Sequence, residues 1–154
     1  MKTDPKLVLG KMQCYCAYRE RCISDIREKV KQYNLVESEK ESIIESLIAE
    51  NYIDEKRYAE SFVRSKFSYN NWGRIKIRYM LTQKGISTST IENALKTIDE
   101  DAYNQLIEKL MQQKVSDLTK RKKTDVPLKV VNYLLGKGFE KSLIYQSIKK
   151  SPLL

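Results

Sequence analysis

Histidine is absent from this 154-residue sequence, and glycine and proline are scarce, with five and three copies. Without histidine, the chain cannot build a Ser-His-Asp triad, a Cys-His pair or a histidine-ligated metal site from its own residues. Five glycines leave little material for a phosphate-binding loop, and neither GxxxxGK[ST] nor GxGxxG occurs. The sequence therefore shows no obvious catalytic apparatus.

Long apolar runs are also missing, because no stretch approaches the roughly 20 residues that cross a bilayer. The first residues include Asp4 and Pro5 and do not form a secretory signal, so we expect a cytoplasmic protein. Cys14, Cys16 and Cys22 are odd in number, which argues against a disulfide framework. A zinc site would need Asp, Glu or a second chain as fourth ligand. We expect three reduced, partly buried thiols and no bound metal.

Helix-forming residues dominate instead, because Lys, Glu, Leu and Ile are common and few segments alternate apolar with polar residues. Candidate helix starts are an N-cap at Asp54, capping boxes at Ser38–Glu41 and Ser89–Glu92, and a start at Asp125 before Pro127. The acidic run 99–101 also suits a helix N-terminus. The sequence therefore predicts an all-α protein.

Two glycines reveal an internal repeat. Residues 77–95 match residues 130–148 in chemical type at seven positions when shifted by 53, with Gly85 aligned to Gly138. Each glycine follows a lysine and precedes an apolar residue, a pattern typical of a left-handed helix C-cap. A fainter copy begins near Ile26, with Asn34 in the place of the glycine.

An amphipathic helix is expected before each helix pair, near residues 10–20, 55–68 and 100–115. The chain then consists of tandem three-helix repeats, three units with boundaries 1–53, 54–98 and 99–154. A unit of about 50 residues buries little core alone, so stacked units predict an elongated curved solenoid. The alternative is one irregular bundle with an accidental repeat, but the matched glycines favour the solenoid.

Positive charge is concentrated in the middle of the chain, which has a net charge of +9. Residues 56–84 contain eight basic residues against Glu60 alone, and so carry +7. These basic residues are Lys56, Arg57, Arg64, Lys66, Arg74, Lys76, Arg78 and Lys84. A second basic run comprises Lys120, Arg121, Lys122 and Lys123. Acidic residues gather instead in 37–55.

Such a charged run is usually a solvated face, but surfaces of that kind mix both signs. The large excess of positive charge in residues 56–84 favours a patch that binds phosphates or an acidic protein surface. Helical spacing places Arg57 with Arg64 and Arg74 with Arg78, whereas Lys76 projects away from the second pair. A patch would therefore need two helices side by side.

Aromatic residues could supplement the patch by stacking on bases. Tyr69 and Trp72 lie in the polar segment SYNNWG and are the better candidates for exposure. Tyr58, Tyr79 and Tyr133 lie near apolar positions, so we expect them in the core.

The middle segments YIDEKRYAESFV (52–63) and NWGRIKIRYMLTQKGI (71–86) carry a family resemblance. They match the patterns G-[YF]-[LI]-[DN]-[DE]-x-R-[FY]-A and G-x-x-[RK]-I-x-x-E-L-x-x-K-G-[IV]. RERCISDIREKV (19–30) and LLGKGF (134–139) match related patterns of the first and third units. On these motifs the chain resembles the RecX family of bacterial recombination regulators. It departs from the family at four positions. Cys22 stands where the family has a serine, Asn51 and Asn71 stand where it has glycines, and Met80 stands where it has a glutamate.

The resemblance implies an all-helical regulator that is not an enzyme and needs no cofactor. Such proteins bind the RecA recombinase filament on single-stranded DNA and suppress its ATPase, strand-exchange and co-protease activities. We expect this chain to act in this way as a monomer. Charge and motif position predict which residues contact the filament. The central contacts are Arg57, Arg64, Arg74, Lys76, Arg78 and Lys84, and the secondary contacts are Lys66 and residues 120–123.

Two other functions stay open at this stage. A free-standing helical DNA-binding protein would use the same basic patch without a recombinase. A helical scaffold for another acidic protein would carry the same charge. The motif residues Tyr58, Ala59, Ile77, Leu81, Gly85 and Ile86 are assigned to packing and capping under every alternative.

Overall fold

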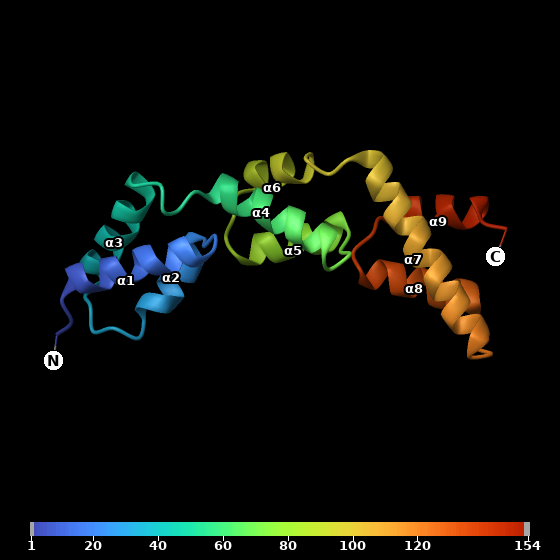
Figure 1. Ribbon diagram of the computed structural model, residues 1–154, viewed down its shortest axis with the longest axis horizontal. Coiled ribbons are helices and arrows are strands. Elements are labelled where there is room, and N and C mark those ends of the chain that lie inside the picture. Colours follow the sequence, from blue (N-terminus) through green and yellow to red (C-terminus); the bar gives the residue numbers. More distant parts are fainter. Residues whose placement is uncertain (1, 153–154) are drawn as a thin grey trace.

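The computed structural model describes residues 2–152, and within that range the chain forms nine α-helices and no strand (Figure 1). The helices are α1 (Pro5–Tyr18), α2 (Ile23–Val30), α3 (Glu37–Ala49), α4 (Glu55–Ser68), α5 (Arg74–Gln83), α6 (Thr88–Leu95), α7 (Glu100–Lys120), α8 (Val126–Gly136) and α9 (Lys141–Lys150). They fall into three repeats, α1–α3, α4–α6 and α7–α9. The all-α prediction is confirmed, while the exact unit boundaries stay a prediction.

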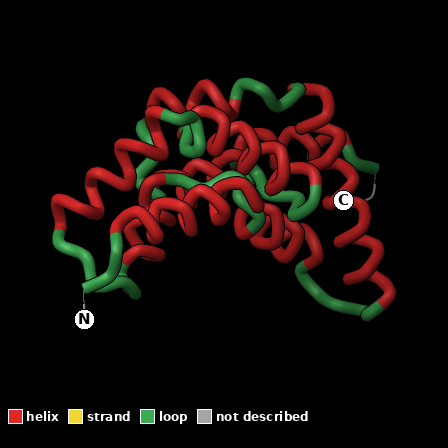
Figure 2. The backbone as a smooth tube through the Cα atoms, turned by 60° about the vertical axis from the view of Figure 1, so that its left-hand side comes forward, coloured by secondary structure: helices red, strands yellow, loops and turns green. Residues whose placement is uncertain are grey.

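The three repeats follow one another along an arch, with the two ends of the chain far apart (Figures 1 and 2). Equivalent helices take equivalent places, so that α2, α5 and α8 follow one another along the lower side of the arch in Figure 1. This is the elongated, curved arrangement that the sequence repeat predicted, rather than an irregular bundle.

Helix N-termini agree with the sequence at some caps and not at others. Asp54 caps α4 by accepting a hydrogen bond from the Arg57 backbone N–H at 3.1 Å, as predicted. The capping box predicted at Ser89 is wrong, because Ser87 is the N-cap of α6 and accepts from the Thr90 N–H at 3.3 Å. Both serines suit a cap, and the chain uses the one that directly follows buried Ile86.

The capping box predicted at Ser38 is also wrong. Helix α3 has Val36 as its N-cap, and the Glu39 carboxylate accepts from the Val36 N–H at 3.0 Å. This hydrogen bond to Glu39 satisfies the Val36 N–H without a serine or threonine at the N-cap, so the helix begins before Ser38. Helix α8 begins after Asp125 as predicted, but Asp125 has a left-handed backbone (φ 53°) and makes no side-chain cap.

Left-handed backbone occurs where the repeat placed its glycines, at Gly85 (φ 80°) and Gly138 (φ 94°). The same prediction for Asn34 is wrong, because α2 ends earlier, with Lys31 as a right-handed cap. Asn51 (φ 62°) and Asn71 (φ 57°) are left-handed instead. Both asparagines replace glycines of the family pattern, and asparagine is the side chain that tolerates this conformation best.

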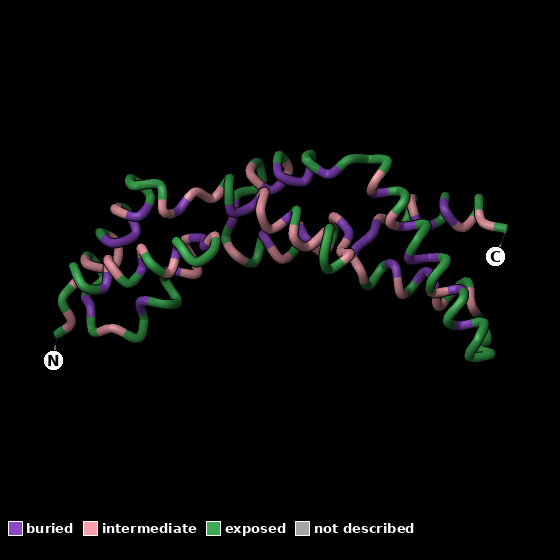
Figure 3. Tube along the Cα trace, viewed as in Figure 1, coloured by how far each residue is buried: buried purple, intermediate pink, exposed green. Residues whose placement is uncertain are grey.

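Buried residues occur along the whole arch (Figure 3), and they form two separate cores. The first repeat has its own core, which includes Met12, Ile26 and Leu47. The second and third repeats share one continuous core, which includes Leu81 and Phe139. The first repeat is therefore joined to the rest with little shared apolar packing.

The tyrosine predictions were partly right. Tyr58 is buried and Tyr69 is 85% exposed, as expected. Tyr133 is only partly buried against the shared core. Tyr79 is 61% exposed, so its placement in the core was wrong. It lies two residues after Ile77, and at about 100° per residue its side chain points away from the buried Ile77–Leu81 stripe.

The cysteines of the first repeat are free thiols, exposed at Cys14 and buried at Cys16 and Cys22. Over residues 2–152, no group of three or more Cys, Asp or Glu residues is arranged to hold a metal ion. None of the helices in the described range is both long enough and apolar enough to cross a membrane.

Candidate functional site

The basic window of 56–84 divides into cations that have internal partners and cations that do not. Arg57 belongs to the first group, because its Nε lies 2.7 Å from the Glu20 carboxylate and its Nη2 donates to the Asn51 carbonyl at 3.0 Å. Glu20 follows α1 and Arg57 lies in the first turn of α4, so this pair joins the first repeat to the second.

Arg74 makes the most extensive internal contacts of the predicted cations. Its side chain is only 14% exposed and pairs with Glu100 at 2.6 Å and with Glu140 at 2.7 Å. Its guanidinium also lies 3.9 Å from the centroid of the Tyr103 ring. Burial alone would lower the pKa of Arg74, but hydrogen bonds to the two carboxylates raise it. This arginine therefore joins the second repeat to the third.

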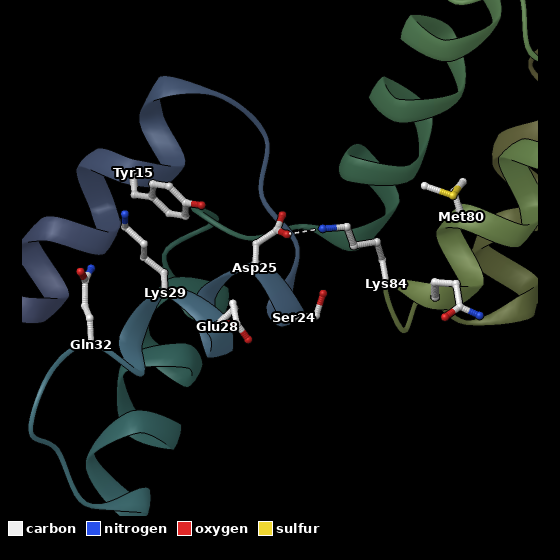
Figure 4. Close-up of a pocket in the computed structure, with 9 residues that line it drawn as sticks. Tyr15, Ser24, Asp25, Glu28, Lys29, Gln32, Met80 and Lys84 are labelled. Atoms are coloured by element: carbon white, nitrogen blue, oxygen red, sulfur yellow. Dashed lines mark hydrogen bonds and ion pairs between the residues drawn. The ribbon is translucent and has the colours of Figure 1, made fainter.

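Arg78 and Lys84 are also paired. Arg78 donates to Glu92 of the same repeat at 2.6 Å. Lys84 reaches across to Asp25 of the first repeat at 2.8 Å (Figure 4). Burial would raise the pKa of Asp25, but hydrogen bonds from Lys84 and from the Cys22 N–H hold it below its ordinary value.

The Asp25–Lys84 pair lies in an open cleft of about 560 Å³ between α2 and α5. Tyr15, Lys29 and Gln32 line it from the first repeat, and Met80 lines it from the second (Figure 4). Met80 replaces a glutamate of the family pattern, so the cleft has no acid at this position.

The remaining predicted contacts have no carboxylate partner within residues 2–152, apart from Arg121, which pairs with Asp117 at 3.5 Å. Arg64 is exposed on α4. Lys120, Lys122 and Lys123 are exposed around the end of α7, well along the chain from the middle repeat. The structure therefore does not gather the predicted residues into one patch.

Lys66 and Lys76 do come together, at the indole of Trp72. The Lys66 ammonium lies 5.0 Å from the Trp72 ring centroid, and the Lys76 ammonium lies 4.5 Å from it. These are cation–π distances. Trp72 itself is partly buried, with its ring edge-on to Phe62 at 6.5 Å. The predicted exposure of Trp72 is thus only partial.

Lys137 completes this group and was missed by the sequence predictions. Its ammonium donates to the Asn70 carbonyl at 2.8 Å. Burial and the nearby charge of Lys76 lower its pKa. The repeat itself carried the signal, because Lys137 aligns with Lys84 at the shift of 53. We call Lys66, Trp72, Lys76 and Lys137 the Trp72 cluster.

Close backbone contact between the second and third repeats holds the Trp72 cluster in place. The Gly73 N–H donates to the Lys137 carbonyl at 2.7 Å, and the Ile75 N–H donates to the Gly138 carbonyl at 2.9 Å. A Cβ on Gly73 would lie 2.3 Å from the Gly138 oxygen, and one on Gly138 would lie 2.4 Å from the Lys76 Cβ. Only glycine allows this approach.

Comparisons with known proteins place this chain. A family model described as RecX, second three-helix domain, matches residues 54–95. A regulatory protein RecX from Clostridium botulinum is 31% identical over 94% of this chain and 73% of its own length. The chain belongs to the RecX family. A RecX protein from Prosthecochloris aestuarii is 28% identical over 95% of this chain and 94% of its own length.

The fold is that of RecX proteins as well. A crystal structure of a regulatory protein RecX superposes with a TM-score of 0.85 and 31% identity over 96% of this chain and 72% of that one. The structure of RecX from Lactobacillus salivarius gives the same TM-score at 24% identity. The chain spans only 53–60% of the length of other RecX relatives, from Limosilactobacillus reuteri and Clostridium acetobutylicum.

The RecX motif residues of this chain serve the fold. Tyr58, Ala59, Ile77, Leu81 and Ile86 are all buried in the shared core. Gly85 supplies the left-handed turn after α5. The assignment of these residues to packing and capping is therefore confirmed.

Proposed function

We propose that this protein binds the RecA recombinase filament on single-stranded DNA and restrains the ATPase, strand-exchange and co-protease activities of the recombinase. The observation that carries the proposal is membership of the RecX regulatory family along nearly the whole chain. It would act in the cytoplasm, as a monomer, by occupying its partner rather than by chemistry.

The shape of the molecule supports this proposal. Three stacked repeats give a long curved surface (Figure 1), and such surfaces suit an extended partner better than a small ligand. A nucleoprotein filament presents DNA phosphates and acidic protein groups along its length. Among the predicted contacts, those without a carboxylate partner in residues 2–152 could meet them, namely Arg64, Lys66, Lys76, Lys120, Lys122 and Lys123.

Arg57, Arg74, Arg78 and Lys84 remain proposed contacts, but their charges already serve internal pairs. Substituting Arg74 would disturb the junction of two repeats, so lost binding in that variant would have two explanations. Arg64→Glu is the cleaner test, because Arg64 is exposed and makes no ion pair within residues 2–152.

The test is the single-stranded-DNA-dependent ATPase of RecA, measured with increasing amounts of this protein and of surplus naked DNA. We expect inhibition at substoichiometric protein that surplus DNA does not relieve. Inhibition that surplus DNA abolishes would support the free-standing DNA-binding function instead. An ATPase unchanged at every ratio would overturn the proposal.

A further inference from the structure

The Trp72 cluster stands out when the two junctions between repeats are superposed by sequence. At the first junction, Asp25 is the third residue of α2 and pairs with Lys84, the C-cap of α5. At the second junction, Lys76 is the third residue of α5, and Lys137 is the C-cap of α8. The same two positions hold opposite charges at one junction and like charges at the other.

The like charges at the second junction have no compensating acid in the described chain. Lys66, Lys76 and Lys137 make no ion pair, and their ammonium groups are placed by the Trp72 ring and the Asn70 carbonyl. Like charges held close together cost free energy. The lowered pKa of Lys137, caused by burial and by Lys76, reflects that cost.

Backbone contacts also position two of these lysines. Lys76 is fixed on α5 by the contact of its Cβ region with Gly138, and Lys137 lies at the turn whose carbonyl caps the α5 N-terminus. Lysine side chains normally lose rotamer entropy when they bind an anion. Here the indole and the carbonyl already contact all three ammonium groups, which reduces that loss.

We propose that the Trp72 cluster binds the phosphodiester backbone of single-stranded nucleic acid, with the external phosphate neutralising these lysines as the Asp25 carboxylate neutralises Lys84 at the first junction. Three ammonium groups with no acid of their own suit the oxygens of a phosphate. The indole holds the ammonium groups rather than a base, so recognition is independent of base identity. This inference does not depend on the recombinase.

Binding can be followed by the fluorescence of Trp72, because it is the only tryptophan in the sequence. The full chain is titrated at low salt with a 12-nucleotide oligothymidylate, with an abasic phosphodiester of the same length and with a polyglutamate of matched charge. Indole fluorescence reports binding. We expect similar affinities for the first two probes and at least tenfold weaker binding of polyglutamate.

The decisive variant is Lys76→Asp, which recreates at the second junction the acid–lysine pair of the first. It should keep or raise the melting temperature while weakening oligothymidylate binding at least tenfold. Lys56→Asp is the matched control, because Lys56 is exposed on α4 and the change in net charge is the same. In Lys66→Gln/Lys137→Gln, the slope of log affinity against log salt should fall by about 1.4 units.

Three results would overturn the assignment. Equal loss of binding in Lys56→Asp and Lys76→Asp would mean that only total charge matters. Failure of the abasic probe would show that the indole stacks on bases. Polyglutamate that binds as tightly as DNA would show that the cluster recognises an acidic peptide. Since no assay contains RecA, each outcome is separate from the ATPase result.

Discussion

The two junctions between repeats are built from equivalent positions but held by different forces. At the first, Arg57–Glu20 and Lys84–Asp25 join two separate cores. At the second, the cores merge, and backbone groups of Gly73 and its neighbours hydrogen-bond directly to the α8–α9 turn. One junction is a pair of half-exposed ion pairs, whereas the other is a continuation of the interior.

Different residues at equivalent positions of the repeats account for much of this difference. Tyr103 of α7 donates from its hydroxyl to Glu140 and accepts from the Arg74 N–H at 2.9 Å. Its counterpart Tyr58 faces Cys22, and the counterpart of Arg74 is Ile23. The first junction therefore lacks the buried guanidinium that bridges the second. Half-exposed ion pairs are worth little, so we expect the first junction to open more readily.

The largest effect is expected when the backbone contact of the second junction is broken. Gly138→Ala places a Cβ 2.4 Å from Lys76 at a left-handed residue, and should cost about 3–4 kcal/mol of unfolding free energy. Gly85→Ala is the control, because its φ is similar but open space surrounds it, so that about 1–2 kcal/mol is expected. Urea unfolding measures both. Equal costs would show that the close approach contributes nothing.

Removing the guanidinium at the second junction should have the next largest effect. Arg74→Met leaves the Glu100 and Glu140 carboxylates and the Tyr103 ring without their cation, and we expect a loss of about 2–3 kcal/mol. The comparable change Arg78→Met breaks an ion pair within one repeat and should cost less than about 1 kcal/mol. Thermal unfolding distinguishes the two variants, and a reversed order would contradict the assigned role of Arg74.

Loosening the first junction should change motion more than stability. Lys84→Met removes the Asp25 contact, with an expected global loss below about 1 kcal/mol. Amide hydrogen exchange should rise in α2 and at the start of α4 while the α5–α8 contact stays protected. Uniform acceleration along the whole chain would mean that the two junctions open together.

The smallest effect is expected at Glu55, the counterpart of Glu100. Burial raises its pKa despite a hydrogen bond from the Ile23 N–H, and its Oε2 is buried without a partner in the described chain. A raised carboxyl pKa means that stability declines as pH rises from the unfolded value, about 4.3, through the folded value. Glu55→Gln should therefore be slightly more stable than the parent at pH 7, by up to about 1 kcal/mol, and this gain should vanish near pH 3.

The sequence was most informative where one residue determines its own backbone or its own helix face. Gly85, Gly138 and Asp54 were placed correctly because left-handed turns and N-caps depend on local chemistry. Ser89 was misassigned because Ser87 has equal capping ability, and Ser38 was misassigned because Val36 is the N-cap of α3. Asn34 was misassigned because α2 ends before it, whereas Asn51 and Asn71 take left-handed turns.

The site was less predictable than the fold. A count of charges treated Arg74 and Lys76 alike, although one is neutralised by two glutamates and the other faces a second lysine. The glutamates lie 26 and 66 residues from Arg74 in sequence, so no local pattern reveals them. Lys137 lies outside the basic window and joins it only when the repeats stack.

The sequence by itself determined that this chain is helical, repetitive and basic at its centre, because helix propensity, periodicity and charge are properties of short segments. Only the tertiary structure decided which cations are neutralised and which remain without an acid. That decision depends on distances between residues of different repeats, and those distances follow from the close approach that Gly73 and Gly138 allow.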